Sequence, residues 1–464
     1  MQIYNTLTKK KEELVPIKSG EISMYVCGPT VYSFIHIGNA RPLIVFDTFR
    51  RYLEYKGLRV TYVQNFTDID DKVIRRANEE GSSYLDVSNK YIGEYFTDAD
   101  SLNVMRSTVN PRATEHIAEI IELCEKLIEK GHAYPADNGD VYFSVRSYPA
   151  YGKLKGQSID DMESGARIDP TEHKKDPLDF ALWKGAKPGE PSWDSPWGKG
   201  RPGWHIECSA MSMKILGETF DIHAGGVDLI FPHHENEIAQ SEAATGKPFA
   251  NYWMHNGHIN VNNQKMSKSL GNFFTVRDIT KEYEPEVLRL FMLGAHYRSP
   301  FNFSRELMDQ AKASLTRLRT AKQRLEAAKI GSASQADADF EDEIKKTEAA
   351  FCAAMDDDLN TADALGVIFD FVRKCNTFVT EPRSQKTLDA ARRLYSDMTG
   401  IFGVLIQEEK ADEFPPEALR ILAERTEARK AKDWAKSDEL RDRLKEMGFA
   451  VVDSKDGAKL KKLD

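Results

Sequence analysis

The chain has 464 residues, of which 30% are charged, and a formal net charge of -9. This length is too great for a single hydrophobic core and predicts about three or more domains. The sequence has no apolar run near the ~18 residues of a membrane span and no signal-peptide core at its start, so we expect a cytoplasmic protein without a membrane segment. The acidic balance excludes wholesale coating of nucleic acid but permits local basic faces.

Predicted strands and helices alternate in the first part of the chain. The strands are expected at 22–27 and 58–64, and the helices at 40–56, 83–104 and 110–130. This alternation is typical of an α/β fold with a parallel, doubly wound (Rossmann-like) sheet. We therefore assign residues 1–130 to the first half of a Rossmann-like domain.

The first of these strands runs into a turn that carries a lone thiol, Cys27, and continues to His36–Asn39 at the start of the next predicted helix. Free backbone N–H groups and the helix dipole attract anions there. We interpret the segment as a phosphate-binding corner with a metal ligand beside it. The alternative is an ordinary βα turn.

Residues 131–203 differ in character from what precedes them. They contain a short strand run at Asp140–Phe143 and a passage rich in Pro, Gly and Trp from Gly185 to Pro202. We predict an insertion that splits the sheet. The second half of the domain is expected at 204–250, with a strand at Phe220–His223 and a helix after Pro232, followed by a region at 251–303 that carries a basic loop.

From Ser304 onward the sequence is helical. Apolar residues at helical spacing predict an antiparallel bundle over 304–405. The expected stripes are Met308, Ala311, Leu315, Leu318 and Leu325; Leu365, Phe369, Val372 and Val379; and Leu388, Ala391, Tyr395 and Met398. Residues 417–464 are expected to form a small α+β domain of two short helices and a strand at Phe449–Val452.

The five cysteines are odd in number and widely scattered, which argues against a disulfide framework. Cys124, Cys352 and Cys375 fall in helical apolar patterns, and we expect them in cores. Cys27 and Cys208 remain as candidate metal ligands.

A possible metal site combines these two thiols with an imidazole and a carboxylate. His233 and Glu237 lie four positions apart on a predicted helix and share one face. Thiolate, imidazole and carboxylate are all zinc donors. His234 competes with His233, and Glu235 with Glu237. Separate buried cysteines and an acidic surface helix are the alternative.

Two further segments are candidates for nucleotide binding. Gly225–Asp228 follows a strand, where glycines permit close approach of a nucleotide and a carboxylate can accept from ribose hydroxyls. Lys265 and Lys268 lie on a glycine-hinged loop and could stabilise charge on a departing pyrophosphate. A simple turn and a solvated basic loop are the respective alternatives.

His36-Ile37-Gly38-Asn39 and Lys265–Ser269 resemble the two signature motifs of class I aminoacyl-tRNA synthetases. Three other segments are similar to cysteinyl-tRNA synthetases in particular, and the resemblance covers essentially the whole chain: Val26–Tyr32, Gly203–Ser209 and Phe231–Glu237. Asn39 stands where the signature more commonly has a second histidine, and an amide can still donate to phosphate.

The resemblance implies the following site residues. One zinc ion per chain would be held by Cys27, Cys208, His233 and Glu237. Cysteine would be bound by Cys27, Thr67, Trp204 and His223. ATP would be bound by His36, Gly38, Asn39, Gly226, Asp228 and Lys268, with His223 and Asp228 on the adenosine side. The catalytic groups would be His36, Asn39, Lys265 and Lys268.

The resemblance also implies the reaction and its partners. Mg-ATP would activate L-cysteine to cysteinyl-adenylate, and the cysteinyl group would pass to the 3'-terminal ribose of tRNA(Cys). Zinc selects the substrate thiolate, so we expect no editing domain. We expect a monomer. One alternative is a mycothiol-type ligase that transfers cysteine to an amino sugar, although such ligases lack the terminal module; another is a non-catalytic RNA-binding descendant.

The parts expected to contact tRNA are the region at 251–303, the bundle and the terminal, anticodon-binding domain. In the bundle the candidate phosphate contacts are Arg317, Arg319, Lys322 and Arg324, and the alternative is that these charges form a solvated face. In the terminal domain Trp434 could stack on a base or pack between the short helices, and we favour packing. After Gly457 the chain has Ala458 and lysines where the family commonly has an aromatic and a basic residue.

Overall fold

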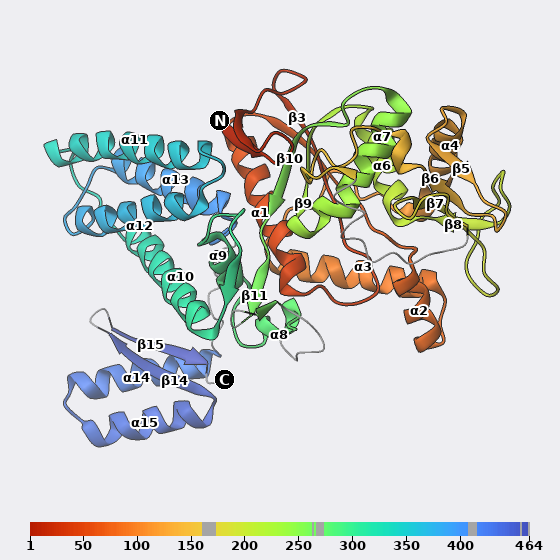
Figure 1. Cartoon of the computed structure of the whole chain (residues 1–464). Helices are drawn as coiled ribbons and strands as arrows, with labels where there is room; N and C mark the ends of the chain where they lie inside the picture. The colour runs from red at the N-terminus through yellow and green to blue at the C-terminus, as the bar shows by residue number, and fades with distance from the viewer. Residues whose placement is uncertain (160–172, 262–263, 266–272, 407–414, 455–456, 463–464) are drawn as a thin grey trace. The chain divides into compact units, whose positions relative to one another are not determined.

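The computed structural model describes residues 1–159, 173–261, 264–265, 273–406, 415–454 and 457–462 (Figure 1). The chain divides into two compact units, Met1–Ile406 and Gln407–Asp464. The finer boundaries expected within the first unit stay predictions. In the part of the chain that is described, we find no helix with both the length and the apolar character that a membrane crossing requires.

A four-stranded parallel sheet forms the centre of the first unit, which confirms the predicted Rossmann-like architecture. Its strand order is β10 (Ala250–Asn256), β9 (Phe220–Gly226), β3 (Glu21–Val26) and β4 (Arg59–Gln64). Tyr25 pairs with His223, and His223 with Trp253. The chain leaves β3 towards β4 on one side and leaves β9 towards β10 on the other, so the topological switch point lies between β3 and β9.

Alternate residues of β3 pack on opposite faces of this sheet, as the pleat requires. Met24 and Val26 join the core that includes the inner side of α1 (Ile37–Tyr55). Tyr25 and Cys27 instead join a cluster with Cys208 of α6 (Trp204–Leu216) and Ile238 of α7 (Glu235–Thr245). The sheet is therefore covered on both faces, and Cys27 faces α6 and α7.

Helices follow β4 much as predicted. They are α2 (Asp71–Glu80), α3 (Tyr84–Ser101) and α4 (Ile117–Glu129), with a short turn at Ala113–Glu115. The helix α2 was not predicted. Its N-cap, Asp70, accepts from the backbone of Lys72, and Gly81 ends it in a left-handed conformation.

The insertion forms its own antiparallel sheet. The order is β5 (Ala133–Pro135), β6 (Val141–Phe143), β7 (Phe180–Gly185) and β8 (Gly200–Pro202), with a short turn at Val145–Ser147. Trp183 is fully buried in its core. The chain passes from β8 directly into α6, so the insertion leads straight to Cys208. Helical turns at Val227–Leu229 and Ile230–His234 connect β9 to α7.

Smaller elements complete the first unit. The N-terminal hairpin is β1 (Gln2–Asn5) and β2 (Lys10–Glu13). A small sheet contains β12 (Gln264–Lys265), β11 (Ile259–Val261) and β13 (Phe301–Phe303). In the sequence, the helices α8 (Val276–Thr280) and α9 (Pro285–Leu293) come between β12 and β13.

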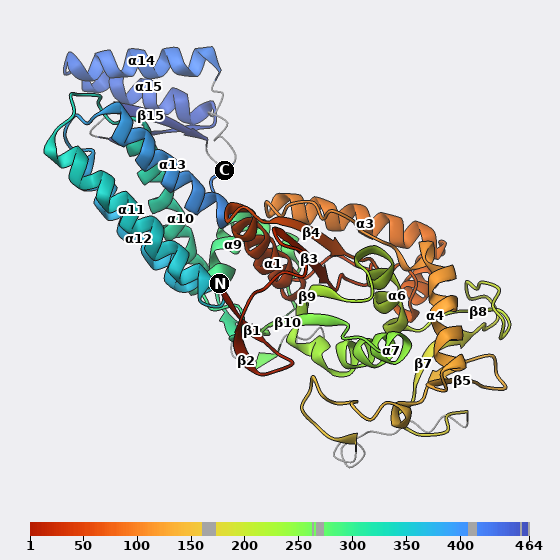
Figure 2. The ribbon, with the colours of Figure 1, turned by 90° about the horizontal axis from the view of Figure 1, so that it is seen from above.

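Four long helices follow: α10 (Arg305–Glu326), α11 (Gln335–Asp356), α12 (Thr361–Phe378) and α13 (Gln385–Ile401). Figure 2 shows α11 and α12 running side by side. The predicted stripes of α10 and α13 are buried. That of α12 was wrong in part: Leu365, Phe369 and Val379 are only half-buried, and the helix turns Ile368, Phe371 and Cys375 inward instead.

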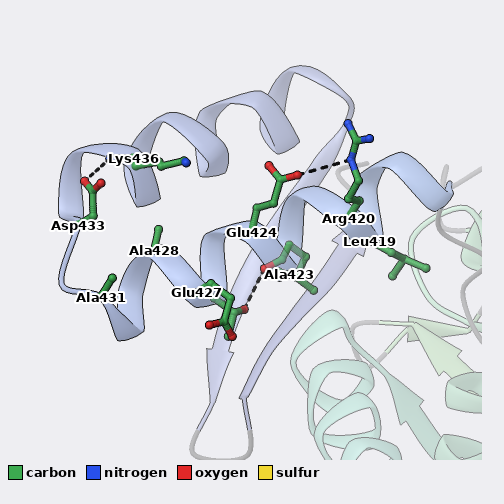
Figure 3. Close-up of a pocket in the computed structure, with 11 residues that line it drawn as sticks. Leu419, Arg420, Ala423, Glu424, Glu427, Ala428, Ala431, Asp433 and Lys436 are labelled. Atoms are coloured by element: carbon green, nitrogen blue, oxygen red, sulfur yellow. Dashed lines mark hydrogen bonds and ion pairs between the residues drawn. The ribbon is translucent and has the colours of Figure 1, made fainter.

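The second unit consists of α14 (Pro416–Lys430), α15 (Trp434–Glu446), β14 (Phe449–Ser454) and β15 (Gly457–Lys462). The two strands pair antiparallel, and Ile421, Leu440 and Leu444 form its core. Trp434 does not pack as expected, because it opens α15 and its residue is 59% exposed. A hollow between α14 and α15, shown in Figure 3, is lined by Ala423, Glu427, Lys436 and their neighbours.

Candidate active site

A pocket of about 420 Å³ opens at the carboxyl ends of β3 and β9. This is the switch point of the sheet, where ligands of open α/β folds bind. Its lining includes most of the residues predicted for substrate binding: Cys27, His36, Gly38, Asn39, Thr67, Trp204, Cys208, Gly226, Asp228 and His233. Segments that are far apart in the sequence are thus brought to one cavity.

Two glycines let backbone segments approach closely at the pocket. A Cβ on Gly28 would lie 1.7 Å from the carbonyl oxygen of Asn65, and the Gly28 N–H donates to Oδ1 of Asn65 at 2.8 Å. A Cβ on Gly226 would lie 2.4 Å from Oδ1 of Asp228. Gly28 is therefore required, because a Cβ there would meet backbone atoms, whereas a Cβ on Gly226 would displace the side chain of Asp228.

The N-terminus of α1 forms one wall of the pocket. His36 and Asn39 make a reciprocal capping box: His36 Nδ1 accepts from the Asn39 backbone, and Asn39 Oδ1 accepts from the His36 backbone, both at 3.3 Å. In a neutral His36 ring the proton then lies on Nε2. The side chain of Asn39 also carries an NH2 group, which can donate, because the cap uses only the oxygen of this side chain. The cap thus orients two N–H donors at a helix N-terminus, where anions bind.

The segment after the second signature motif pairs with the first. His36 and Thr275 form an antiparallel bridge, and the Ile37 N–H donates to the carbonyl of Phe274 at 3.0 Å. The ring of Phe273 lies 5.0 Å from that of His36. Lys265 pairs through its backbone with Asn260. The side chain of Lys265 and the whole of Lys268 lie outside the described residues, so their roles stay predictions.

Arg41, one turn into α1, ties this wall to the strand that leads to the second motif. It is fully buried, and its guanidinium donates to the carbonyls of Gly257 at 2.6 Å and Ser299 at 2.6 Å, with further bonds to His258 and His296. Burial lowers the pKa of Arg41 to about 9. Four carbonyl oxygens hold this cation in place.

The four predicted metal ligands lie together, each offering one donor atom within 4.8 Å of the others. Sγ of Cys27 is 3.9 Å from Sγ of Cys208 and 3.5 Å from Oε1 of Glu237, which is 3.0 Å from Nε2 of His233. Two zinc–sulfur bonds of about 2.3 Å at a tetrahedral angle hold their sulfurs about 3.8 Å apart. The donor set therefore fits zinc in both chemistry and spacing.

A second group, Cys27, His223, His234 and Glu237, satisfies the same distance limit. Its two histidines are fully buried, whereas Cys208 and His233 line the pocket. His223 Nε2 is bonded to Oε2 of Glu237 at 2.8 Å, and His234 Nδ1 to His255 Nε2 at 2.8 Å. His223 and His234 therefore lie behind the pocket-lining residues Cys208 and His233.

The four predicted ligands differ in the direction of their pKa shifts. A hydrogen bond from the Cys27 thiol lowers the pKa of Cys208 to about 6. Burial opposes ionisation of Glu237, but attraction to His223 and His233 outweighs it and lowers the Glu237 pKa to about 2. Burial and the neighbouring histidine rings lower the pKa of His234 well below its ordinary value. Among the other predicted ligands, burial opposes ionisation of His233, but Glu237 and Cys208 outweigh it and raise the His233 pKa to about 10. Burial raises the pKa of the Cys27 thiol well above its ordinary value. Zinc binding would therefore release a proton from each of these two groups.

Thr67 and Trp204 lie beside the metal cluster at the pocket wall. The Trp204 ring stacks on His233 at 4.3 Å, and the Thr67 hydroxyl donates to the Glu207 carboxylate at 3.0 Å. His223 was expected to contact cysteine and adenosine. It lies behind this wall, and its Nε2 is bonded to Glu237.

Sequence reasoning missed several polar residues of the site. Tyr32, Gln64, Lys72 and His258 line the pocket, and Glu207 lies behind it. Lys72 directly follows the acidic run Asp68–Asp71. It could have been recognised as a candidate phosphate ligand, because the carboxylates of that run would not hold a phosphate. Nothing in the local pattern signals Glu207, which is an acidic residue in the first turn of a helix.

The basic residues expected on the bundle make contacts within the chain. Arg319 pairs with Glu284 at 2.5 Å and Glu286 at 2.9 Å, while Arg317 lies 4.6 Å over the Phe369 ring. Lys322 reaches the carbonyl of Leu405, and Arg324 reaches the side chain of Asn376. A role in phosphate contact stays a prediction for all four.

Comparisons with known proteins show the family to which the chain belongs. The family model of the class I (C) tRNA synthetase catalytic domain matches residues 13–313, a DALR domain matches 350–407, and a cysteinyl-tRNA ligase anticodon-binding domain matches 411–459. The chain is 56% identical over 466 aligned residues to a cysteine–tRNA ligase of Caldicellulosiruptor saccharolyticus, covering 100% of both chains.

Solved structures support the fold alone, at low sequence identity. A methionyl-tRNA synthetase of Mycobacterium tuberculosis with methionyl-adenylate matches with a TM-score of 0.57 at 14% identity, covering 82% of this chain and 89% of the other. A LeuRS–tRNA–LeuAMS complex from Agrobacterium radiobacter K84 matches with a TM-score of 0.59 at 11% identity, covering 84% and 85%. By its matched domains and its full-length identity, the chain belongs to the cysteine–tRNA ligase family of class I tRNA synthetases.

Proposed function

We propose that this protein activates L-cysteine with Mg-ATP and transfers the cysteinyl group to tRNA(Cys). One observation carries the proposal most strongly: Cys27, Cys208 and His233 of the metal cluster line the same pocket as His36 and Asn39 at the N-terminus of α1. A site that can hold a thiol thus adjoins a site that can hold phosphates.

The metal in this proposal is zinc, held by Cys27, Cys208, His233 and Glu237. Bound there, zinc would ligate the substrate sulfur as a thiolate, which serine cannot match because its hydroxyl is a harder and far less acidic donor. His223 orients the Glu237 carboxylate through the 2.8 Å bond to Oε2. Trp204 covers the cluster on the pocket side by stacking on His233.

The nucleotide would lie between α1 and the end of β9. Nε2–H of His36 and the amide of Asn39 would donate to phosphate oxygens at the helix N-terminus. Gly226 leaves room for the nucleoside, and Asp228 would accept from a ribose hydroxyl. Lys265 and Lys268 would stabilise the charge that develops on pyrophosphate.

Both chemical steps then depend on positioning. A carboxylate oxygen of cysteine attacks the α-phosphorus, the bond to the bridging oxygen breaks, and pyrophosphate leaves with its electron pair. The terminal ribose hydroxyl of the tRNA next attacks the carbonyl carbon of the mixed anhydride, loses its proton, and displaces AMP. The chain supplies orientation and donors for charge in each step.

The match of residues 411–459 to an anticodon-binding domain favours tRNA over an amino sugar as acceptor. The described part of this domain folds as a compact unit with its own core. A ligase for a small acceptor has no use for such a unit.

Cysteine-dependent exchange of radiolabelled pyrophosphate into ATP tests the first step, and charging of purified tRNA(Cys) tests the second. We expect exchange with cysteine, little with serine, and loss of exchange in the Cys208→Ser variant. No exchange by the wild type with any amino acid would overturn the proposal. Exchange followed by charging of an amino sugar but not tRNA would replace the acceptor.

A further inference from the structure

Lys72 is the only lysine or arginine among the described residues that line the active-site pocket. It is the second residue of α2, and its side chain is exposed, with Nζ over the Tyr32 ring at 5.6 Å from the ring centroid. The other members of this described lining that can carry positive charge are histidines, which titrate near neutral pH. Lys72 is therefore the permanent cation of the described pocket wall.

The acidic residues before Lys72 do not neutralise its ammonium group. Within the described part of the chain Lys72 makes no ion pair, although it follows Asp70 and Asp71 directly. Asp70 accepts from the backbone N–H of Lys72 at 2.8 Å and thereby caps α2. Asp71 is paired with Lys184 at 3.0 Å and also with Arg201. The ammonium group of Lys72 can therefore meet an anion in the pocket.

The ion pairs of Asp71 place Lys72 where the insertion meets the Rossmann-like sheet. Lys184 lies on β7 and Arg201 on β8, which are two strands of the insertion. Arg201 is buried. The first turn of α2 is thus fixed against the insertion, and β8 runs directly into α6, the helix of Cys208.

The strand order separates Lys72 from the proposed nucleoside site. The nucleoside would lie at the end of β9, whereas α2 comes after β4, on the other side of β3. A bridge between Thr30 and Thr67 continues the pairing of the chain after β3 with the chain after β4, so α2 begins on the β4 side. The strands β9 and β4 are two positions apart, or about 10 Å at the usual spacing. The N-terminus of α1, where the ATP phosphates would bind, follows β3 and lies between them.

We propose that Lys72 binds the phosphate that joins the last two nucleotides of tRNA(Cys) during the transfer step; this inference rests on the proposed function. AMP would occupy the pocket between α1 and the end of β9, and the cysteine sulfur would be held at the metal cluster. The acceptor ribose then reaches the carbonyl carbon from the side of β4 and α2. Lysine is a common phosphate contact in nucleic-acid complexes. The phosphate is attached to the terminal ribose itself, so holding it restricts where the attacking hydroxyl can lie.

Separate measurement of the two chemical steps tests this assignment in the zinc-loaded full-length protein. Lys72→Met keeps a long side chain and removes the charge. Cysteine-dependent pyrophosphate exchange, including the KM for ATP, should stay close to that of the wild type. Single-turnover transfer from preformed cysteinyl-adenylate to tRNA(Cys) should slow roughly 10- to 100-fold, the range of a hydrogen bond to a charged group. Lys72→Arg, which keeps the charge, should restore most of the transfer rate.

Lys90→Met is the matched control. Lys90 lies on α3, pairs with Glu80 at 3.3 Å and is absent from the described lining of the pocket. Its replacement also removes one exposed lysine charge from this part of the molecule. Both exchange and transfer should be unchanged in this variant.

A modified tRNA identifies the phosphate that is bound. Replacing the last phosphodiester by an uncharged methylphosphonate removes the anion that Lys72 would contact. Wild-type transfer to this tRNA should slow about as much as transfer by Lys72→Met does with the natural tRNA. The variant and the modified tRNA together should show no further loss, as expected for two changes to one contact.

Three outcomes would overturn the inference. One is an unchanged transfer rate in folded Lys72→Met, for which Lys72→Gln substitutes if the methionine variant does not fold. Another is an equal loss of exchange and transfer, which would assign Lys72 to ATP or to cysteine. The third is a wild-type transfer rate that is insensitive to the methylphosphonate. Absence of exchange by the wild type would instead overturn the proposed function, so the two failures are distinguished.

Discussion

Arg289 on α9 forms an ion pair with Asp47 on α1, and both side chains are buried. The same guanidinium donates to the carbonyls of Phe402, after α13, and of Leu102, after α3. Asp47 also accepts from Arg51 and from the backbone of Met105. One buried pair thus joins the helix that carries the first signature motif to the end of the bundle.

Asp47→Asn should lower the free energy of unfolding of the first unit by roughly 3–5 kcal/mol, because it leaves the Arg289 charge buried and unpaired. Denaturant titration followed by circular dichroism measures the change. Glu21→Gln, which breaks the exposed pair with Arg59, is the matched control and should cost under about 1 kcal/mol. Equal effects of the two variants would contradict this account.

The same pair should make stability fall in acid. Burial raises the pKa of Asp47, but Arg289 and Arg51 outweigh it and hold the pKa below its ordinary value. A depressed carboxyl pKa stabilises the fold above the unfolded-state value of about 3.9, and the contribution is lost as the pH falls through the folded pKa. The stabilities of wild type and Asp47→Asn should therefore converge below about pH 4, and a constant difference down to pH 3 would refute this.

Asn39→Asp should separate the cap from phosphate binding. Aspartate keeps the acceptor for the His36 N–H and suits the helix dipole, so thermal stability should hold. A negative charge facing phosphates should raise the KM for ATP roughly tenfold or more, with a smaller change in the KM for cysteine. Asn39→His, which restores a donor, is the control. A large fall in stability would show that the amide itself holds the helix.

Cys208→Ser should remove the metal while Cys124→Ser should not. Both cysteines are buried, but Cys124 lies on α4, in the hydrophobic core that also contains residues of the insertion. We expect the zinc content of Cys208→Ser, measured by atomic absorption after brief chelator treatment, to fall well below one per chain. Cysteine affinity should fall far more than ATP affinity. Equal losses for both substrates would indicate a metal without contact to the amino acid.

Arg41→Lys tests whether a guanidinium group is required to bind the four carbonyl oxygens at once. Lysine keeps the charge but cannot reach Gly257 and Ser299 together, so we expect a loss of roughly 2–3 kcal/mol in stability. The rate of pyrophosphate exchange should fall, because the strand leading to the second motif loses its tie to α1. Arg298→Lys, at a partly exposed position, is the comparison variant.

Local patterns predicted the Rossmann-like domain well because hydrophobic residues recur with a clear period in both its strands and its helices. The strand predicted at 58–64 appears as β4, and the helix at 40–56 as α1 with its start at Ile37. The helix α12 shows the limit of predicting the buried face of a helix from the spacing of its apolar residues. Leu365, Ile368, Phe369 and Phe371 are all apolar, so two stripes fit the spacing, and the neighbouring helices α10 and α11 decide which of them is buried.

The predicted metal ligands could be chosen only through the resemblance, since Cys27, Cys208 and Glu237 come from three separate elements, and their role stays a prediction. Glu207 could not be predicted at all, because its burial depends on how α6 packs against the segment at Thr67. Trp434 was predicted wrongly for a similar reason: its position at the first turn of α15 places an apolar side chain at the surface.

The two-sided packing of β3 has a consequence for assembly of the enzyme. Val26 faces the α1 core and Cys27 faces α6, so a slip of the strand by one residue would exchange them. The misfolded sheet would then present a valine to the proposed metal site and bury a thiol among aliphatic side chains. If zinc binds there as proposed, a molecule that holds the ion has its strand in the correct alignment, and metal content would report the correctly folded fraction of a preparation.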